Sequence, residues 1–302
     1  MPYLRMTLPE LIARFDCESK CRAYLEKLRW PDGPVCPKCG KKETARVSGR
    51  ESVLRCVGCQ AQFTVTAGTV FNDSHLPLSK WLLATFLMCE SKKGISALQL
   101  QRMLAIGGYK TAWYLCHRIR SAMLETHKEL LKGIVEIDET YVGGKARRFR
   151  PYSEKQVVIG IRVRGGDLRL IRAQEATSQA IRDILKEHLS EDVDVLITDE
   201  SVIYPFAFDG KQKAIHKTIR HKEGYVTGDV HTNTVESAFS LLKRGIMGTW
   251  HRMSVKHLPA YLDEMVFRFN RRKSTTLFQD TMRHMVTAPV LTFEKLTKEK
   301  AA

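Results

Sequence analysis

The sequence predicts an α/β (α+β) core in the C-terminal half of the chain, preceded by a small metal-binding module and a helical region. Two Cys-x2-Cys pairs indicate the module. Apolar residues at helical spacing after residue 78 indicate the helical region. Strands, a helix, a further strand and a last helix indicate the core. The four expected segments are 1–75, 76–131, 132–275 and a C-terminal tail at 276–302.

The cysteine pairs predict a zinc ribbon. Sixteen residues separate the two pairs, which is the spacing of a tetrahedral four-cysteine Zn2+ site. Gly40 and Gly58 would help each pair to form a tight turn, and residues 44–47, 52–55 and 63–66 read as short strands. The alternative is two unrelated redox pairs. The expected zinc ligands are Cys36, Cys39, Cys56 and Cys59.

The second segment has the pattern of a helix-turn-helix. Ser79 is expected to cap a first helix, and two further short helices are joined by a turn at Gly107-Gly108. The last of them would present Lys110, Arg118 and Arg120 to DNA. A small helical bundle without a DNA-binding role would show the same pattern.

The third segment has the element order of a ribonuclease H-like core. Three consecutive strands are expected at 134–142, 157–163 and 168–173, with a hairpin turn at Gly165-Gly166 between the last two. A helix at 178–189, a buried strand ending at Asp199 and a helix at 231–245 complete the order.

Carboxylates within this core predict a magnesium site. Strand side chains alternate between faces, so Glu136 and Asp138 point one way while Glu139 points the other. In a ribonuclease H-like sheet the first and fourth strands are neighbours, which brings Asp138 beside Asp199. Two such carboxylates repel each other unless a cation lies between them, and Mg2+ (or Mn2+) suits oxygen ligands. Glu236, on the last helix, would supply the third ligand.

Each of these acids also has a purely structural interpretation. Asp199 could cap the following helix, and Asp138 could pair with an arginine. Asn233 and Glu236 have the spacing of a capping box, which would contribute about 0.5–2 kcal/mol to helix stability. Glu136 has no assigned role, although it lies on the same strand face as Asp138.

The charge balance favours a nucleic-acid partner. The chain carries 49 Lys and Arg against 33 Asp and Glu, a formal net charge of +16, and such an excess suits a polyanion. Basic residues cluster at 141–172 and 211–222. A solvated basic surface is the alternative. In these clusters and on the last helix, the expected DNA contacts are Lys145, Arg147, Arg148, Lys211, Lys213, Lys217, Lys243 and Arg244.

The sequence also predicts an internal, reducing compartment. The longest apolar run, 81–89, is too short to span a bilayer. The N-terminal residues lack the apolar core of a signal peptide. We therefore expect a cytoplasmic, nucleoid-associated protein in which cysteines serve as metal ligands or buried thiols.

The chain resembles bacterial insertion-sequence transposases of the zinc-ribbon DDE group related to Merlin elements. The resemblance rests on motifs spread over residues 29–272, most of the chain. These motifs are Arg29-Trp-Pro with the first cysteine pair, Lys93-Gly-Ile-Ser-Ala97, Lys110-Thr-Ala-Trp113, Ile137-Asp-Glu-Thr-Tyr-Val-Gly-Gly144, Thr198-Asp-Glu200, His231-Thr-Asn-Thr-Val-Glu236, Leu242-Lys-Arg-Gly245, Tyr261-Leu-Asp-Glu264 and Phe267-Arg-Phe-Asn-Arg-Arg272.

The resemblance implies a catalytic role for Asp138, Asp199 and Glu236. Sixty residues separate the first two acids and thirty-six the last two, as the group's pattern expects. The third position varies within the group and is reported as asparagine in some members, so Asn233 is an alternative contributor.

The function expected from these features is Mg2+-dependent cleavage and joining of double-stranded DNA at the terminal inverted repeats of an element. A homodimer or larger synaptic complex would hold the paired ends. Two alternatives stay open: a DNA-binding regulator with an inert catalytic domain, and a ribonuclease H-like nuclease that cuts without joining.

Overall fold

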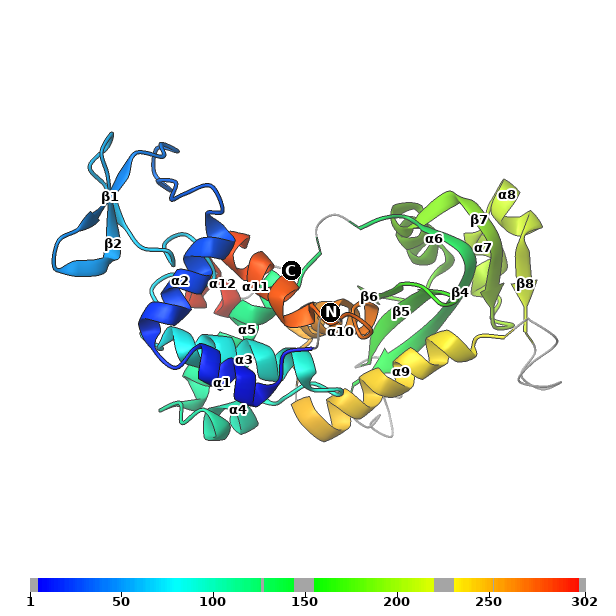
Figure 1. Ribbon diagram of the computed structural model, residues 1–302. Helices are drawn as coiled ribbons and strands as arrows, with labels where there is room; N and C mark the ends of the chain where they lie inside the picture. Colours follow the sequence, from blue (N-terminus) through cyan, green and yellow to red (C-terminus); the bar gives the residue numbers. More distant parts are fainter. Residues whose placement is uncertain (1–4, 126–127, 144–154, 220–230, 252, 299–302) are drawn as a thin grey trace. The chain divides into compact units, whose positions relative to one another are not determined.

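The computed structural model describes residues 5–125, 128–143, 155–219, 231–251 and 253–298 (Figure 1). These residues form two compact units. Unit 1 combines residues 1–124 with residues 271–302, and unit 2 comprises 125–270. The zinc ribbon and the helical region, expected as separate domains, therefore belong to one unit together with the C-terminal segment.

Unit 1 begins with two helices and a three-stranded antiparallel sheet in the order β1-β2-β3. A set of helices follows, and two of them come from the C-terminal segment. The elements are α1 Leu8–Arg14, α2 Glu18–Arg29, β1 Thr44–Val47, β2 Arg50–Cys56, β3 Gln62–Phe63, α3 Leu78–Glu90, α4 Ala97–Met103, α5 Tyr109–Ala122, α11 Leu277–Thr287 and α12 Phe293–Thr297.

The C-terminal segment is part of the helical core of unit 1, and the expectation of a tail is wrong. Phe278 and Met285 of α11 are buried. The ring of Phe278 lies 5.8 Å from that of Phe86 in α3, and the Thr85 hydroxyl contacts the Met285 sulfur at 3.3 Å. The spacing of apolar residues in α11 matches an amphipathic helix that buries one face.

A glutamate from another helix caps α3. Ser79 was expected as its cap, but the helix begins at Leu78 without a side-chain cap from its own N-cap residue. Instead, the carboxylate of Glu18 in α2 accepts hydrogen bonds from the backbone N–H groups of Leu78 and Ser79, at 3.0 and 3.1 Å. A carboxylate at a helix N-terminus accepts hydrogen bonds from otherwise unpaired backbone N–H groups and interacts favourably with the positive end of the helix dipole.

Unit 2 is built on a five-stranded mixed sheet with the order β6-β5-β4-β7-β8. The first three strands along the chain pair antiparallel, whereas β7 is parallel to β4 and β8 is parallel to β7. The elements are β4 Leu131–Val142, β5 Gln156–Val163, β6 Leu168–Ala173, α6 Ser178–His188, β7 Leu189–Thr198, α7 Ile203–Ala207, α8 Gly210–Ala214, β8 His216–Thr218, α9 Asn233–Gly245, the π-helical turn η1 Ile246–Trp250 and α10 Leu258–Asn270.

Helices cover both faces of this sheet (Figure 1). One face packs Val135 and Ile137 of β4 against α6 and α7. The other packs Val158 of β5 against α9 and α10, including Phe239 of α9. The predicted neighbouring of the first and fourth strands is confirmed, since β4 pairs with β7 at the centre of the sheet.

A glycine permits the close approach of α9 to the sheet. Gly160 of β5 lies opposite Asp138 in the ladder. A Cβ atom at this position would lie 2.6 Å from Cζ of Phe239 and 2.8 Å from Cγ2 of Val235. Atoms cannot approach so closely, so α9 can rest on this part of β5 only because the residue there has no side chain.

We predict that Gly160→Ala destabilises unit 2 by about 1–3 kcal/mol, because the added methyl group overpacks the interface between β5 and α9. Chemical denaturation would measure the loss. Gly248→Ala is the matched control, since a Cβ at Gly248 meets no atom within 4 Å. Replacing Phe239 with Leu in the Gly160→Ala background should recover part of the loss; equal stability of Gly160→Ala and wild type would contradict this account of the packing.

Candidate functional site

The four cysteines of the ribbon form a cluster suited to a metal ion. Their sulfur atoms all lie within 4.8 Å of one another. Cys36 and Cys59 are 3.7 Å apart, and Cys39 and Cys56 are 3.5 Å apart. A tetrahedron with Zn–S bonds of 2.3 Å has edges of about 3.8 Å. The donors and their spacing therefore fit Zn2+.

Two equivalent turns carry these cysteines. The Gly40 N–H donates to the Cys36 carbonyl, and the Gln60 N–H donates to the Cys56 carbonyl. Gly40 has φ +74° and Gln60 has φ +59°. In the second turn the left-handed position is therefore occupied by Gln60. Gly58 lies within this turn, and its backbone N–H, after that of Cys59, lowers the pKa of Cys56. Backbone N–H groups also favour the thiolate: burial opposes ionisation of Cys36, but donation from Cys39 and Lys38 lowers its pKa to about 7.

Asp138 and Asp199 come from neighbouring parallel strands. Glu136 is in register with Ile197. Continuing the register by two residues sets Asp138 beside Asp199, which directly follows the last residue of β7. The Asp199 carboxylate accepts from the Ser201 N–H at 3.0 Å. It does not cap α7, whose N-cap is Val202, so the alternative of a helix-capping Asp199 is wrong.

Glu236 lies in the first turns of α9, on the helix that packs over the Asp138 face of the sheet. The helix begins with Thr232 as N-cap. Asn233 is therefore the first helical residue and is exposed. The predicted capping box between Asn233 and Glu236 is absent; the Glu236 carboxylate instead accepts a hydrogen bond from the Thr232 hydroxyl at 2.7 Å.

The carboxylates interact electrostatically. Burial, followed by the charges of Glu139, Asp199 and Glu236, raises the pKa of Asp138 from 3.8 to about 7. The ionisation of Asp138 is therefore coupled to the charges of all three other acids. Among the described residues, the four cysteines are the one group of three or more potential ligands that converges on a possible metal position.

Glu136 has a role that the sequence did not reveal. Its side chain is fully buried and paired with Arg164, at 2.9 Å. The same carboxylate accepts from the Thr234 N–H at 2.9 Å, the Thr234 hydroxyl at 2.6 Å and the Val235 N–H at 3.1 Å. Glu136 thus binds the N-terminus of α9 to β4, two residues from Asp138.

Glu139 faces the opposite side of the sheet, as the alternation of side chains predicted. There its carboxylate accepts a short hydrogen bond from the hydroxyl of Tyr204 in α7. Burial, and then the charge of Asp199, raises the pKa of Glu139. The electrostatic interaction of Glu139 with the other acids could have been inferred from the sequence, because Glu139 adjoins Asp138. Its hydrogen bond to Tyr204 could not, because Tyr204 is 65 residues away along the chain.

Two of the predicted DNA contacts are buried. Arg118 and Arg120 of α5 are 3% and 2% exposed. Arg118 donates to the Asn72 carbonyl and lies over the rings of Trp81 and Tyr114. Neither side chain is available to the phosphates of a duplex, because most of α5, including these two residues, is buried in the helical core of unit 1. Lys110, at the start of α5, is exposed.

The other predicted DNA contacts divide into two groups. Lys145, Arg147 and Arg148 lie outside the described residues. The remaining side chains are exposed on unit 2, at α8, β8 and the last turn of α9: Lys211, Lys213, Lys217, Lys243 and Arg244.

Comparison with known proteins identifies the family. Residues 130–270 match the ISXO2-like transposase domain, and residues 17–62 match the transposase zinc-ribbon domain. A relative from Halobacterium salinarum, named an uncharacterized protein in transposable element ISH50, is 30% identical over 254 residues. The match covers 77% of this chain and 84% of the relative. The chain belongs to the family of ISXO2-like transposases. In its described part, every helix is too short or too polar to cross a membrane.

We predict one tightly bound zinc per chain, and Cys39→Ser should lose it to a chromogenic chelator that leaves wild type loaded. Three thiolates hold the ion less strongly than four, and binding of structural zinc contributes about 10–16 kcal/mol to folding of such modules. Metal analysis after dialysis measures the content. Cys17→Ser is the control, because Cys17 is exposed and outside the cluster. Full zinc retention by Cys39→Ser would contradict the assignment.

We also predict a pH-dependent stabilisation by Asp138→Asn in magnesium-free buffer. Because the folded pKa of Asp138 is raised from 3.8 to about 7, the native state binds the proton more tightly than the unfolded state. Wild-type stability should therefore fall as pH rises between about 4 and 7, by at most about 1.4 kcal/mol per pH unit.

The asparagine variant lacks this titration, so its free energy of unfolding relative to wild type should increase from pH 5 to pH 8. Urea denaturation at both pH values measures the difference. Asp192→Asn, at an exposed position of unit 2, controls for the loss of a negative charge. The prediction fails if the two variants respond alike.

Proposed function

We propose that this chain is a DNA transposase of an insertion sequence that cleaves and joins strands at the element's terminal inverted repeats, using Mg2+ or Mn2+. The observation that carries the proposal is the convergence of three acids from separate elements. The register of β4 with β7 leads from Asp138 to Asp199, the charge of Glu236 on α9 contributes to the raised pKa of Asp138, and the chain belongs to a family of transposases.

The topology of unit 2 supports this function. Its sheet order, β6-β5-β4-β7-β8 with an antiparallel half and a parallel half, agrees with the proposal of a ribonuclease H-like core. In such a core, acids on the central strands would lie where a DNA backbone can approach them. The fold supports the site, and the acids carry the chemistry.

The raised pKa of Asp138 also supports a cation site. Mutually repelling carboxylates that must ionise together favour a divalent cation between them. When bound, Mg2+ would activate the attacking water or 3′-hydroxyl and stabilise the leaving oxygen. Asp138, Asp199 and Glu236 would hold the ions, and the Thr232 hydroxyl would orient the Glu236 carboxylate through its 2.7 Å hydrogen bond. Asn233, exposed one turn earlier in α9, is the alternative third contributor.

Unit 1 and the exposed cations would bind DNA. The ribbon and the pair α4–α5 would recognise the terminal repeats as a zinc module and a helix-turn-helix, with Lys110 as the exposed cation at the start of α5. Lys211, Lys213, Lys217, Lys243 and Arg244 would contact phosphates near the acids, with a contribution from Lys145, Arg147 and Arg148. A homodimer or larger complex would pair two ends.

We predict that Asp138→Asn and Asp199→Asn abolish strand cleavage and strand transfer while the fold and DNA binding remain, because a neutral amide cannot replace a carboxylate on Mg2+. Glu236→Gln should do the same unless Asn233 substitutes for it. Asp192→Asn is again the control. The substrate is a duplex with the element's own end and a target plasmid, and sequencing of junctions detects joining.

Melting temperature, measured on the same variants, separates loss of chemistry from loss of fold. Robust strand transfer by folded Asp138→Asn would end the proposal. Cleavage without junctions by wild type would favour a nuclease, and end binding without cleavage would favour a regulator.

A further inference from the structure

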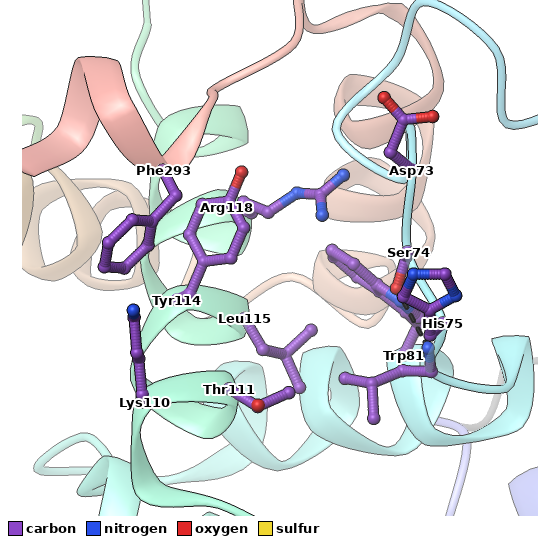
Figure 2. A pocket seen from close by; sticks show the side chains of 11 residues that line it. Asp73, Ser74, His75, Trp81, Lys110, Thr111, Tyr114, Leu115, Arg118 and Phe293 are labelled. Atoms are coloured by element: carbon purple, nitrogen blue, oxygen red, sulfur yellow. Dashed lines mark hydrogen bonds between the residues drawn. The ribbon is translucent and has the colours of Figure 1, made fainter.

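A pocket of about 390 Å³ lies within unit 1, beside the start of α5. Figure 2 shows its lining side chains converging from three segments: the stretch before α3 together with α3, the first turns of α5, and the start of α12. Its volume falls within the range of sites for small ligands, roughly 300–1,000 Å³. None of the acids and thiols described above lines it.

Aromatic rings form its walls. Trp81, Tyr114 and Phe293 line the cavity, and the last two rings lie 5.5 Å apart in an edge-on arrangement. The polar atoms of two rings are already used: the Trp81 N–H donates to the Ser74 hydroxyl at 2.9 Å, and the Tyr114 hydroxyl donates to the Leu291 carbonyl. These bonds fix the rings, so the walls are rigid without a ligand.

Cations complete the pocket. Arg118 is 97% buried, since only 3% of it is exposed, and its Nε atom has no hydrogen-bond partner among the described residues. Its guanidinium lies 5.0 Å from the Trp81 ring centre and 5.1 Å from that of Tyr114. Lys110 reaches over the Phe293 ring at 4.3 Å. A buried donor without a partner is costly, and here it borders a cavity.

A nucleotide matches this combination of groups. Its base is planar and stacks on aromatic side chains, its edge accepts hydrogen bonds, and its phosphate is attracted to Lys110. An aliphatic ligand would leave the Nε–H group of Arg118 without an acceptor, and a lone inorganic anion would not use the three rings. Asp73, also in the lining, could accept from the amino groups of a base.

We propose that this pocket binds one unpaired nucleotide of the DNA that the protein processes, with the base among Trp81, Tyr114 and Phe293. The inference rests on the proposed function, because it assumes a DNA substrate. In this proposal Lys110 and Arg118 both contact DNA. A base within a paired duplex could not reach the buried Arg118. An unpaired base is accessible because extrusion from the stack frees its faces and edges.

Photochemical crosslinking with the full zinc-loaded chain tests the proposal. The probe is an element-end duplex with a single-stranded overhang that carries one 5-iodouracil, and a matched probe has the same base within the paired region. We expect crosslinks to peptides containing Trp81, Tyr114 or Phe293 from the overhang probe and about tenfold fewer from the paired probe.

Thr111→Phe should lower the overhang crosslink by roughly tenfold, because Thr111 is exposed and lines the cavity, so the larger ring would fill it. Lys92→Ala, which removes an exposed cation outside the lining, is the control and should leave the yield unchanged. Zinc content and melting temperature confirm that Thr111→Phe is folded. An equal yield from folded Thr111→Phe, or crosslinks only outside the pocket, overturns the proposal.

A second arm uses free 5-iodo-deoxyuridine monophosphate at the same concentration. Binding of a base within DNA predicts a much lower yield from the free nucleotide, and equal yields would overturn the assignment to DNA. Strand transfer is measured in parallel with wild type. Active strand transfer without pocket crosslinks rejects the pocket alone, whereas pocket crosslinks without cleavage or joining reject the proposed function alone.

Discussion

The hydrogen bonds between Glu136 and the N-terminus of α9 connect the two halves of the carboxylate site. Glu136 is fully buried on β4 and accepts from the Thr234 and Val235 N–H groups. Burying a carboxylate is costly unless it is paired and hydrogen-bonded, and Arg164 with these N–H groups meets both conditions. Glu236 directly follows the two residues that fix the end of α9 to the strand of Asp138. Packing of Val235 and Phe239 of α9 on β5 at Gly160 adds a second constraint on the helix.

The same device occurs in unit 1, where Glu18 of α2 accepts from the first N–H groups of α3. In both cases the capping group comes from an element distant in the chain. Such a cap contributes to helix stability as a local one does, because orphan donors are satisfied. It also fixes the relative position of two elements, which a cap within the helix cannot do.

Alternation and order along the chain were enough to predict much of unit 2. Strand geometry alone predicts that Glu136 and Asp138 share one face of the sheet and that Glu139 lies on the other. The pairing of β4 with β7 follows from the order of elements. Partners that come from elsewhere in the chain were not predictable in this way. Nothing near Glu136 indicates that α9 lies over it, and nothing near Glu139 indicates Tyr204.

Unit 1 was harder to predict for the same reason. Arg118 and Arg120 are basic residues on a helix and were expected to contact DNA, yet both are buried. Arg118 donates to the Asn72 carbonyl and lies over the ring of Trp81 in α3, contacts that are distant in the sequence. The left-handed position at Gln60 was missed because glycine is the usual residue there, and the sequence offers Gly58 two positions earlier. The burial of α11 depends on its fit to α2, α3 and α5, which pattern alone does not specify.

The discontinuity of unit 1 has a consequence for synthesis. Residues 271–302 complete this unit, but all of unit 2 must be translated before they emerge. At ribosomal rates of about 5–20 residues per second, that interval lasts on the order of ten seconds or more. Throughout it, the face of α3 that Phe278 and Met285 later cover is without its partner, whereas unit 2 has its whole sequence as soon as the interval ends. Unit 2 can therefore fold before the unit that precedes it in the chain, and the pocket wall supplied by Phe293 is among the last parts to form.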